Sequence, residues 1–123
     1  MLSYSEVNMR NANPELISSI KKKTLELLMQ KEPAEIGMRE IAANCGVSAT
    51  AIYHYYKEKE RLFQEIALDC LEQTNGILEG AAENADSPKQ KVLDSIRAFR
   101  GWCLKNPRVA SLVMEKIVVL AGF

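Results

Sequence analysis

The sequence predicts an all-α protein, and three observations lead to this prediction. Apolar residues recur at steps of three and four along most of the chain, which is the spacing of one helix face. Proline follows a good N-cap residue at three places, Asn13-Pro14, Ser87-Pro88 and Asn106-Pro107, as is typical of helix starts. No stretch reads convincingly as a strand. We therefore expect helices joined by short connections.

The first expected helix runs from Pro14 to about Lys31, after a polar arm of residues 1–13 that we expect to be mobile. Pro33 ends it, because a proline disfavours helical geometry at the residue before it, here Glu32. Its buried face is expected to comprise Ile17, Ile20, Thr24, Leu27 and Leu28.

The stretch from Met38 to Leu62 predicts two short helices joined by a tight turn. Ile41 and Ala42 follow Met38 at steps of three and four, which places one apolar stripe on the first of them. Gly46 can adopt a left-handed conformation without steric cost, so the chain can turn sharply there.

The second short helix is expected from Ala49 to about Tyr56, with the Ser48 hydroxyl as its N-cap. Ile52 and Tyr56 are four residues apart and can both face inward. The side chains left on the outside are then Ala49, Thr50, Tyr53 and His54. This is the pattern of a helix-turn-helix that presents its second helix to a partner, most often the major groove of DNA.

Three longer helices are expected after this motif. The first begins at residues 58–60 and runs towards Glu83, and Ser87-Pro88-Lys89-Gln90 is a capping box that opens the next, to about Lys105. The last is expected over residues 108–121, with an apolar end at Ile117, Val118, Val119 and Leu120. The middle helix is expected to bury Val92, Leu93, Ile96, Phe99 and Cys103.

Composition excludes several classes of protein. The 123 residues carry 16 basic and 16 acidic side chains, and neither half is strongly basic, so any positive surface must be local. Three cysteines without metal-ligand spacing argue against a disulfide framework and favour a reducing cytoplasm. The sequence shows no signal peptide and no apolar run long enough for a membrane. With a single histidine and no phosphate-binding glycine loop, we expect no catalytic residues, no metal site and no cofactor.

The helix-turn-helix stretch resembles the TetR family of bacterial transcriptional regulators. The residues that carry the resemblance are Ile41-Ala42, Gly46-Val47-Ser48, Ile52-Tyr53, Tyr56, Lys59 and Leu62. It implies a three-helix DNA-binding domain over residues 1–57, followed by a regulatory and dimerisation domain over residues 58–123 that looks incomplete. It also implies a cytoplasmic homodimer on palindromic operator DNA, usually a repressor that a small-molecule effector releases.

The contacts to DNA are expected from the second short helix and the residues beside it. Ala49, Thr50, Ala51 and His54 are placed nearest the bases, with Ser48 at the helix start, and the resemblance implies phosphate contacts for Tyr53 and Lys59. Part of the Lys21–Lys23 cluster is either a solvated face or a further phosphate contact. Ala51 and Gly37 stand where the family usually has hydroxyl side chains, so a contact is expected to be missing there.

The candidate ligand pocket is drawn from the later helices: Cys70, Phe99, Trp102, Cys103 and Met114. These residues either line a cavity for an effector or form an ordinary core. The apolar end of the last helix needs a partner, so the chain is either a fragment of a longer regulator or a short form that self-associates. A second function also stays open, a helical protein-interaction module that keeps the fold without specific DNA binding.

Overall fold

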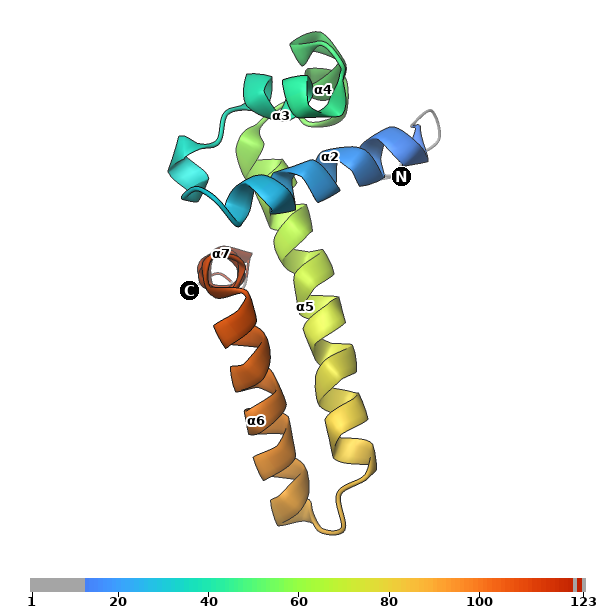
Figure 1. Ribbon diagram of the computed structural model, residues 1–123, viewed down its shortest axis with the longest axis vertical. Helices are drawn as coiled ribbons and strands as arrows, with labels where there is room; N and C mark the ends of the chain where they lie inside the picture. Colours follow the sequence, from blue (N-terminus) through green and yellow to red (C-terminus); the bar gives the residue numbers. More distant parts are fainter. Residues whose placement is uncertain (1–12, 121, 123) are drawn as a thin grey trace. The chain divides into compact units, whose positions relative to one another are not determined.

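The computed structural model describes residues 13–120 and residue 122, and this part of the chain is helical throughout (Figure 1). The elements are α2 (Pro14–Leu28), the 3-10 helix η1 (Pro33–Glu35), α3 (Met38–Cys45), α4 (Ala49–Tyr55), α5 (Lys59–Glu83), α6 (Pro88–Lys105) and α7 (Pro107–Leu120). Residues 13–120 contain no strand, which confirms the all-α prediction. The predicted arm lies outside the described residues apart from Asn13.

The chain divides into two compact units, Met1–Leu62 and Phe63–Phe123. The division falls inside α5, so this helix contributes its first turn to the N-terminal unit and its remainder to the C-terminal unit. The boundary after residue 57 stays a prediction.

In the N-terminal unit, α2 begins as the sequence predicts and ends earlier. The Asn13 side-chain oxygen accepts hydrogen bonds from the backbone N–H groups of Glu15 and Leu16, at 3.1 and 3.2 Å. The helix ends at Leu28 rather than near Lys31, and η1 then begins at Pro33. Such differences of two or three residues are usual at helix ends, where the last turn unwinds.

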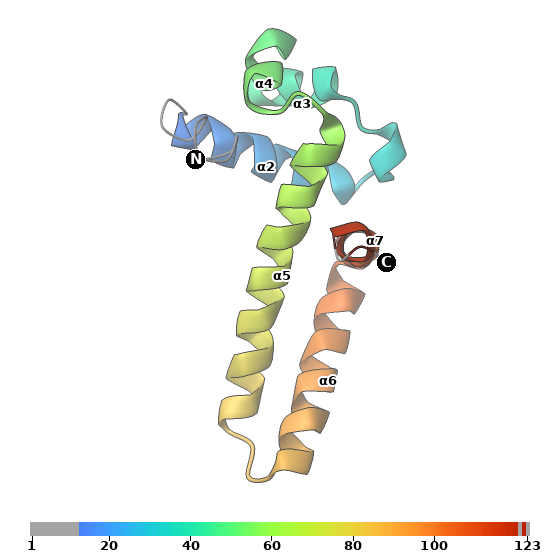
Figure 2. The same ribbon diagram turned by 180° about the vertical axis from the view of Figure 1, so that it is seen from behind.

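The core of the N-terminal unit is aliphatic, and α3 packs against both α2 and α4 (Figures 1 and 2). The one buried polar side chain of α2, Thr24, donates its hydroxyl to the Ile20 carbonyl at 2.7 Å, so its burial leaves no unpaired group. An ion pair between Lys31 and Glu40 also joins the segment after α2 to the first turn of α3. The fully buried aliphatic side chains of this unit are Ile20, Leu28, Ile36, Ile41, Ile52 and Leu62.

In the C-terminal unit, α5 and α6 run alongside each other in opposite directions (Figures 1 and 2). The Ser87 hydroxyl accepts from the N–H of Gln90 at 3.1 Å and so caps α6 as predicted. The other half of the predicted capping box is wrong. The Gln90 amide does not turn back to Ser87, because it donates to the Asp94 carboxylate at 2.7 Å, one turn further along α6.

The last helix, α7, packs against the end of α6. Its start at Pro107 agrees with the prediction to within a residue, but Asn106 serves the preceding helix. The Asn106 side-chain amide donates to the Trp102 carbonyl at 3.0 Å, and so satisfies a carbonyl at the end of α6. The buried side chains of α6 and α7 are Trp102, Val109, Ala110, Leu112, Val113 and Lys116.

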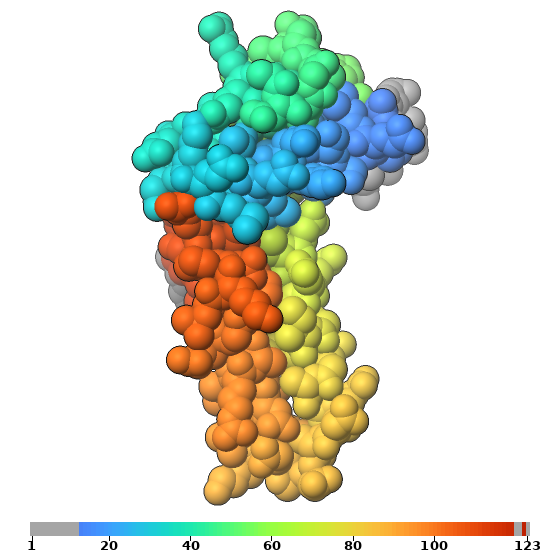
Figure 3. Space-filling view, in the orientation of Figure 1, coloured from blue at the N-terminus to red at the C-terminus, as the bar shows by residue number. Residues whose placement is uncertain are grey.

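The predicted buried face of α6 is wrong for this structure. Val92 and Ile96 are both 58% exposed, Leu93 and Phe99 are also exposed, and Cys103 is only half-buried. Figure 3 shows α6 lying open along the surface of the C-terminal unit. The apolar spacing correctly identified one face of the helix, but no other described element of the C-terminal unit covers that face. Trp102 is the buried side chain of α6 instead.

Candidate nucleic-acid interface

The turn between α3 and α4 has the geometry that the sequence predicts. Gly46 ends α3 with φ 68° and ψ 28°, in the left-handed region. The Gly46 N–H donates to the Ala43 carbonyl and the Val47 N–H donates to the Ala42 carbonyl, both at 3.1 Å. These two bonds are those of a Schellman motif, which satisfies the last carbonyls of α3 while reversing the chain.

Helix α4 is a short helix with one side anchored and the other exposed. The Ser48 hydroxyl accepts from the Ala51 N–H at 3.2 Å, which confirms the predicted N-cap. Ile52 is 0% exposed and is the buried side chain of α4, while Tyr56 is buried directly after its end. Burial of one isoleucine is worth about 1.5–3 kcal/mol, so this side chain anchors the helix.

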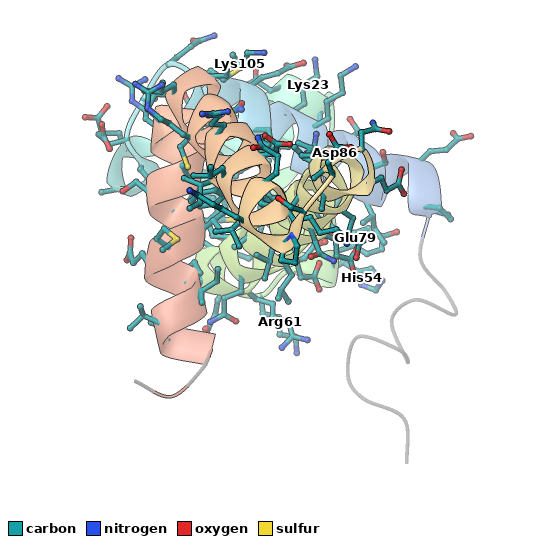
Figure 4. All side chains as sticks on the ribbon, turned by 90° about the horizontal axis from the view of Figure 1, so that it is seen from below. Lys23, His54, Arg61, Glu79, Asp86 and Lys105 are labelled. Atoms are coloured by element: carbon teal, nitrogen blue, oxygen red, sulfur yellow. The ribbon has the colours of Figure 1, made fainter. Side chains whose placement is uncertain are left out.

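The outward side of α4 carries most of the side chains that the sequence places against DNA. Thr50, Tyr53 and His54 are exposed, with Tyr53 at 45%. The imidazole of His54 lies at the surface, as labelled in Figure 4. Ala49 and Ala51 are half-buried, so their methyl groups present less surface than predicted. Hydroxyl, phenol and imidazole groups can form hydrogen bonds with base edges and phosphate oxygens.

A hydrogen bond that the sequence did not predict joins α4 to the start of α2. The backbone N–H of Asn13 donates to the Tyr55 hydroxyl at 3.2 Å. The ring of Tyr55 also meets the ring of His54 edge to face, with 5.0 Å between their centroids. Tyr55 therefore holds the end of α4 near the residue that caps α2. The two residues are 42 positions apart, so no local pattern in the sequence could indicate this contact.

Lys59 donates to two backbone carbonyls of the N-terminal unit. Its ammonium nitrogen lies 3.0 Å from the Pro33 oxygen and 3.0 Å from the Ile36 oxygen. The phosphate contact that the family resemblance implies for Lys59 stays a prediction, and the structure gives the same group a second task. No local pattern in the sequence indicates this task, because its acceptors are backbone atoms more than 20 positions away.

Three further basic residues lie on α3, directly after α4 and in the first turn of α5, and they were not predicted as DNA contacts from the sequence. Arg39 on α3 and Lys57 after α4 are both exposed. Arg61 is exposed as well, and Figure 4 shows its side chain projecting outward from α5. Exposed basic side chains of this kind can contact phosphate oxygens.

The residues of the candidate ligand pocket do not share one environment. Cys70 and Trp102 are buried and Cys103 is half-buried, whereas Met114 is 55% exposed. Phe99 is exposed on α6 and stacks on Trp102, with ring centroids 6.5 Å apart. Burial raises the pKa of the Cys70 thiol, and the neighbouring Asp69 carboxylate raises it further. A thiol held in its neutral form is a poor nucleophile, which fits a packing role for Cys70.

The described residues contain neither a cluster of potential metal ligands nor a helix that could span a membrane. No three His, Cys, Asp or Glu side chains of residues 13–120 gather as potential metal ligands. No helix in the same range combines the length and apolar character that crossing a bilayer requires.

A Schellman turn followed by a short, capped helix with an exposed polar side defines a helix-turn-helix domain, a module that places its second helix in the DNA major groove. Residues 20–66 match the family described as bacterial regulatory proteins, tetR family. The matched residues contain the helix-turn-helix described above, so this part of the chain is similar to the DNA-binding segment of that family.

Curated relatives show the same similarity. Over 100 residues the chain is 27% identical to HTH-type transcriptional regulator Rv1816 of Mycobacterium tuberculosis (strain ATCC 25618 / H37Rv). It is equally similar to HTH-type transcriptional regulator Mb1846 of Mycobacterium bovis (strain ATCC BAA-935 / AF2122/97). Each match covers 80% of this chain and 43% of the relative, so the chain spans less than half the length of these curated relatives. No solved structure matches the chain significantly.

Proposed function

We propose that this chain acts in a sequence-specific, DNA-binding transcriptional regulator. In this proposal the regulator is a ligand-responsive repressor that binds a palindromic operator as a homodimer. The observation that supports the proposal most directly is α4 itself. Its single buried side chain, Ile52, fixes the helix to the domain, and the opposite side exposes Thr50, Tyr53 and His54. A helix anchored in this way can enter a major groove without losing its packing.

The exposed side chains divide by the kind of contact they can make. Thr50 lies in the first turn of α4, where its hydroxyl can bond a base edge. Tyr53, one turn further along, can donate its hydroxyl to a phosphate oxygen. We therefore assign base recognition to the first turn of α4. We assign to Tyr53 a contact with the DNA backbone that orients the domain on the DNA.

The second subunit belongs to the same proposal and is argued from the C-terminal unit. Exposed apolar side chains on α7, Met114, Val118 and Val119, offer a surface that a second copy of the chain could cover. Two subunits related by a two-fold axis would read two half-sites in opposite orientation, which is why we propose a palindromic operator. The small-molecule effector is proposed from the family resemblance alone.

The experiment that tests the function is selection of bound fragments from sheared genomic DNA at moderate salt, followed by sequencing. An enriched inverted repeat is the expected result and would also identify the operator. Uniform, salt-sensitive retention would support DNA binding and contradict specific recognition by a dimer. If no fragment is retained, the alternative function gains support, a protein-interaction module, which the zero net charge also favours.

A Tyr53→Phe variant is expected to weaken binding about fivefold on operator and mixed-sequence DNA alike, since one hydrogen bond to phosphate is lost. The dependence of affinity on salt should not change, because the phenol carries no charge. Fluorescence anisotropy at several salt concentrations measures both quantities. Tyr56→Phe is the control, because the Tyr56 side chain is buried and its hydroxyl is out of reach of DNA. A change in the ratio of operator to mixed-sequence affinity would contradict the assignment of Tyr53 to phosphate.

Sedimentation is expected to show self-association of the chain at tens of micromolar. A Val119→Asp variant, which places a charge on the exposed apolar side of α7, should shift the equilibrium to the monomer. Ser111→Asp is the matched control, since Ser111 is an exposed polar residue of the same helix. A purely monomeric wild-type chain would refute the proposed pairing through α7.

A further inference from the structure

Lys59 directly follows the helix-turn-helix and is hydrogen-bonded to the segment that precedes it. It is the first residue of α5, three residues after the Tyr56 C-cap of α4. The two carbonyls it meets at 3.0 Å belong to Pro33, the first residue of η1, and Ile36, the residue that follows η1. Both hydrogen bonds lie in a partly buried environment.

These acceptors lie directly before the start of α3. The Pro33 oxygen also accepts the Ile36 N–H at 3.2 Å, so the ammonium group and the turn share one acceptor. Ile36 is buried, and the chain passes from it through a single residue, Gly37, into α3 at Met38. Gly37 has no side chain with which to cap α3. The position of the helix start therefore depends on contacts made by the preceding turn.

A lysine is an unfavourable choice for the first position of a helix. The N-terminus of a helix carries a partial positive charge, and a cation there is repelled rather than stabilised. Lys59 opens α5, the longest helix in the described range, so its charge does not help that helix. The two carbonyl oxygens, each a partial negative charge, offset this repulsion. The contact with residues 33–36 is therefore a stabilising role that a lysine can serve at this position.

We propose that Lys59 is a positioning residue that closes the helix-turn-helix by joining its exit to its entry, and that its ammonium group stays on these carbonyls when DNA is bound. The inference rests on the proposed DNA-binding function and changes one assignment within it, because the family resemblance places Lys59 on phosphate. A phosphate contact that replaced these bonds would cost the ammonium group two charge-assisted hydrogen bonds within the protein.

Nitrogen-15 NMR of the lysine ammonium groups tests the proposal on the wild-type chain. In the free protein, the Lys59 signal, assigned by its loss in Lys59→Met, should exchange slowly with water and show coupling to backbone carbonyl carbons. Addition of a mixed-sequence DNA duplex should leave this signal and its coupling in place. A Lys59 signal that exchanges as fast as those of exposed lysines, or one that gains coupling to phosphorus on DNA, would overturn the proposal.

The Lys59→Met variant provides a second test, with Lys57→Met as the matched control because Lys57 is an exposed lysine two residues earlier. Loss of the two bonds should lower the thermal midpoint of Lys59→Met by about 5 °C and leave that of Lys57→Met within about 1 °C. Well below its midpoint, folded Lys59→Met should bind DNA about tenfold more weakly, with altered amide shifts at Gly37 and Met38. An unchanged midpoint and unchanged shifts, together with weaker binding, would instead place Lys59 on phosphate.

The proposed function and the proposed role of Lys59 can fail separately. If the wild-type chain binds no DNA but Lys59 shows the protected signal, the proposed function is wrong while the contact with residues 33–36 stands. If the chain binds DNA and the Lys59 signal moves to phosphate, the positioning role is wrong while the proposed function stands.

Discussion

An Ile52→Ala variant is expected to lose roughly 2–5 kcal/mol of the free energy of unfolding and to lose DNA binding with it. Ile52 is fully buried, and it is the buried side chain of the seven-residue helix α4. A helix this short is unstable without tertiary contacts, so removal of its anchor leaves α4 frayed even where the remaining helices stay folded. Chemical denaturation measures the loss of stability, and anisotropy with operator DNA measures the loss of binding.

Two variants at nearby positions separate packing from DNA contact. Ile52→Val removes one methylene and should cost about 0.5–1.5 kcal/mol, with a correspondingly small loss of affinity. Thr50→Ala alters an exposed side chain of the same helix, and should leave stability within about 0.5 kcal/mol while reducing discrimination between sequences. If Ile52→Ala were as stable as the wild-type protein, α4 would have to be held by contacts other than the buried isoleucine.

The sequence predicts the helix-turn-helix closely because its determinants are local. The cap at Ser48 bonds a residue three positions ahead, and the turn at Gly46 depends on the backbone freedom of one residue. The inward direction of Ile52 and Tyr56 follows from their spacing alone. Each of these features can be read within a window of a few residues, and the structure confirms each of them.

The features that the sequence did not predict join distant parts of the chain. Tyr55 bonds Asn13, and Lys59 bonds Pro33 and Ile36, in each case through a backbone group. A backbone N–H or carbonyl is present at nearly every residue, so no residue type marks it as a partner. The resemblance to a known family directed attention to Lys59 but supplied a role on DNA instead of the contact within the domain.

The wrong prediction for α6 has a different cause. The spacing of Val92, Ile96 and Phe99 identifies an apolar helix face correctly, but periodicity carries no information about what covers that face. Buried and exposed apolar faces have the same pattern in the sequence. Only the arrangement of the other helices decides between them, and the other described helices of the C-terminal unit leave this side of α6 exposed.

A Gly46→Ala variant is expected to lose about 1–2 kcal/mol of stability, because an L-residue with a side chain is strained in the left-handed conformation. The cost arises from the backbone alone: φ is 68°, and a Cβ atom added at Gly46 would meet no heavy atom within 4 Å. Gly46→Asn should cost less, because asparagine tolerates this conformation. Denaturation midpoints of the two variants test this order.

The matched control for Gly46 lies in α5, where Gly76 is an exposed residue in the interior of the helix. A Cβ atom at Gly76 would likewise meet nothing within 4 Å, but the backbone there is helical. Gly76→Ala should therefore raise stability by about 0.5–1 kcal/mol, opposite in sign to the same substitution at Gly46. If both substitutions shifted stability in the same direction, the turn at Gly46 would not depend on its left-handed backbone. The pair thus isolates one dihedral angle as the reason why α4 is turned away from α3 and can face a partner.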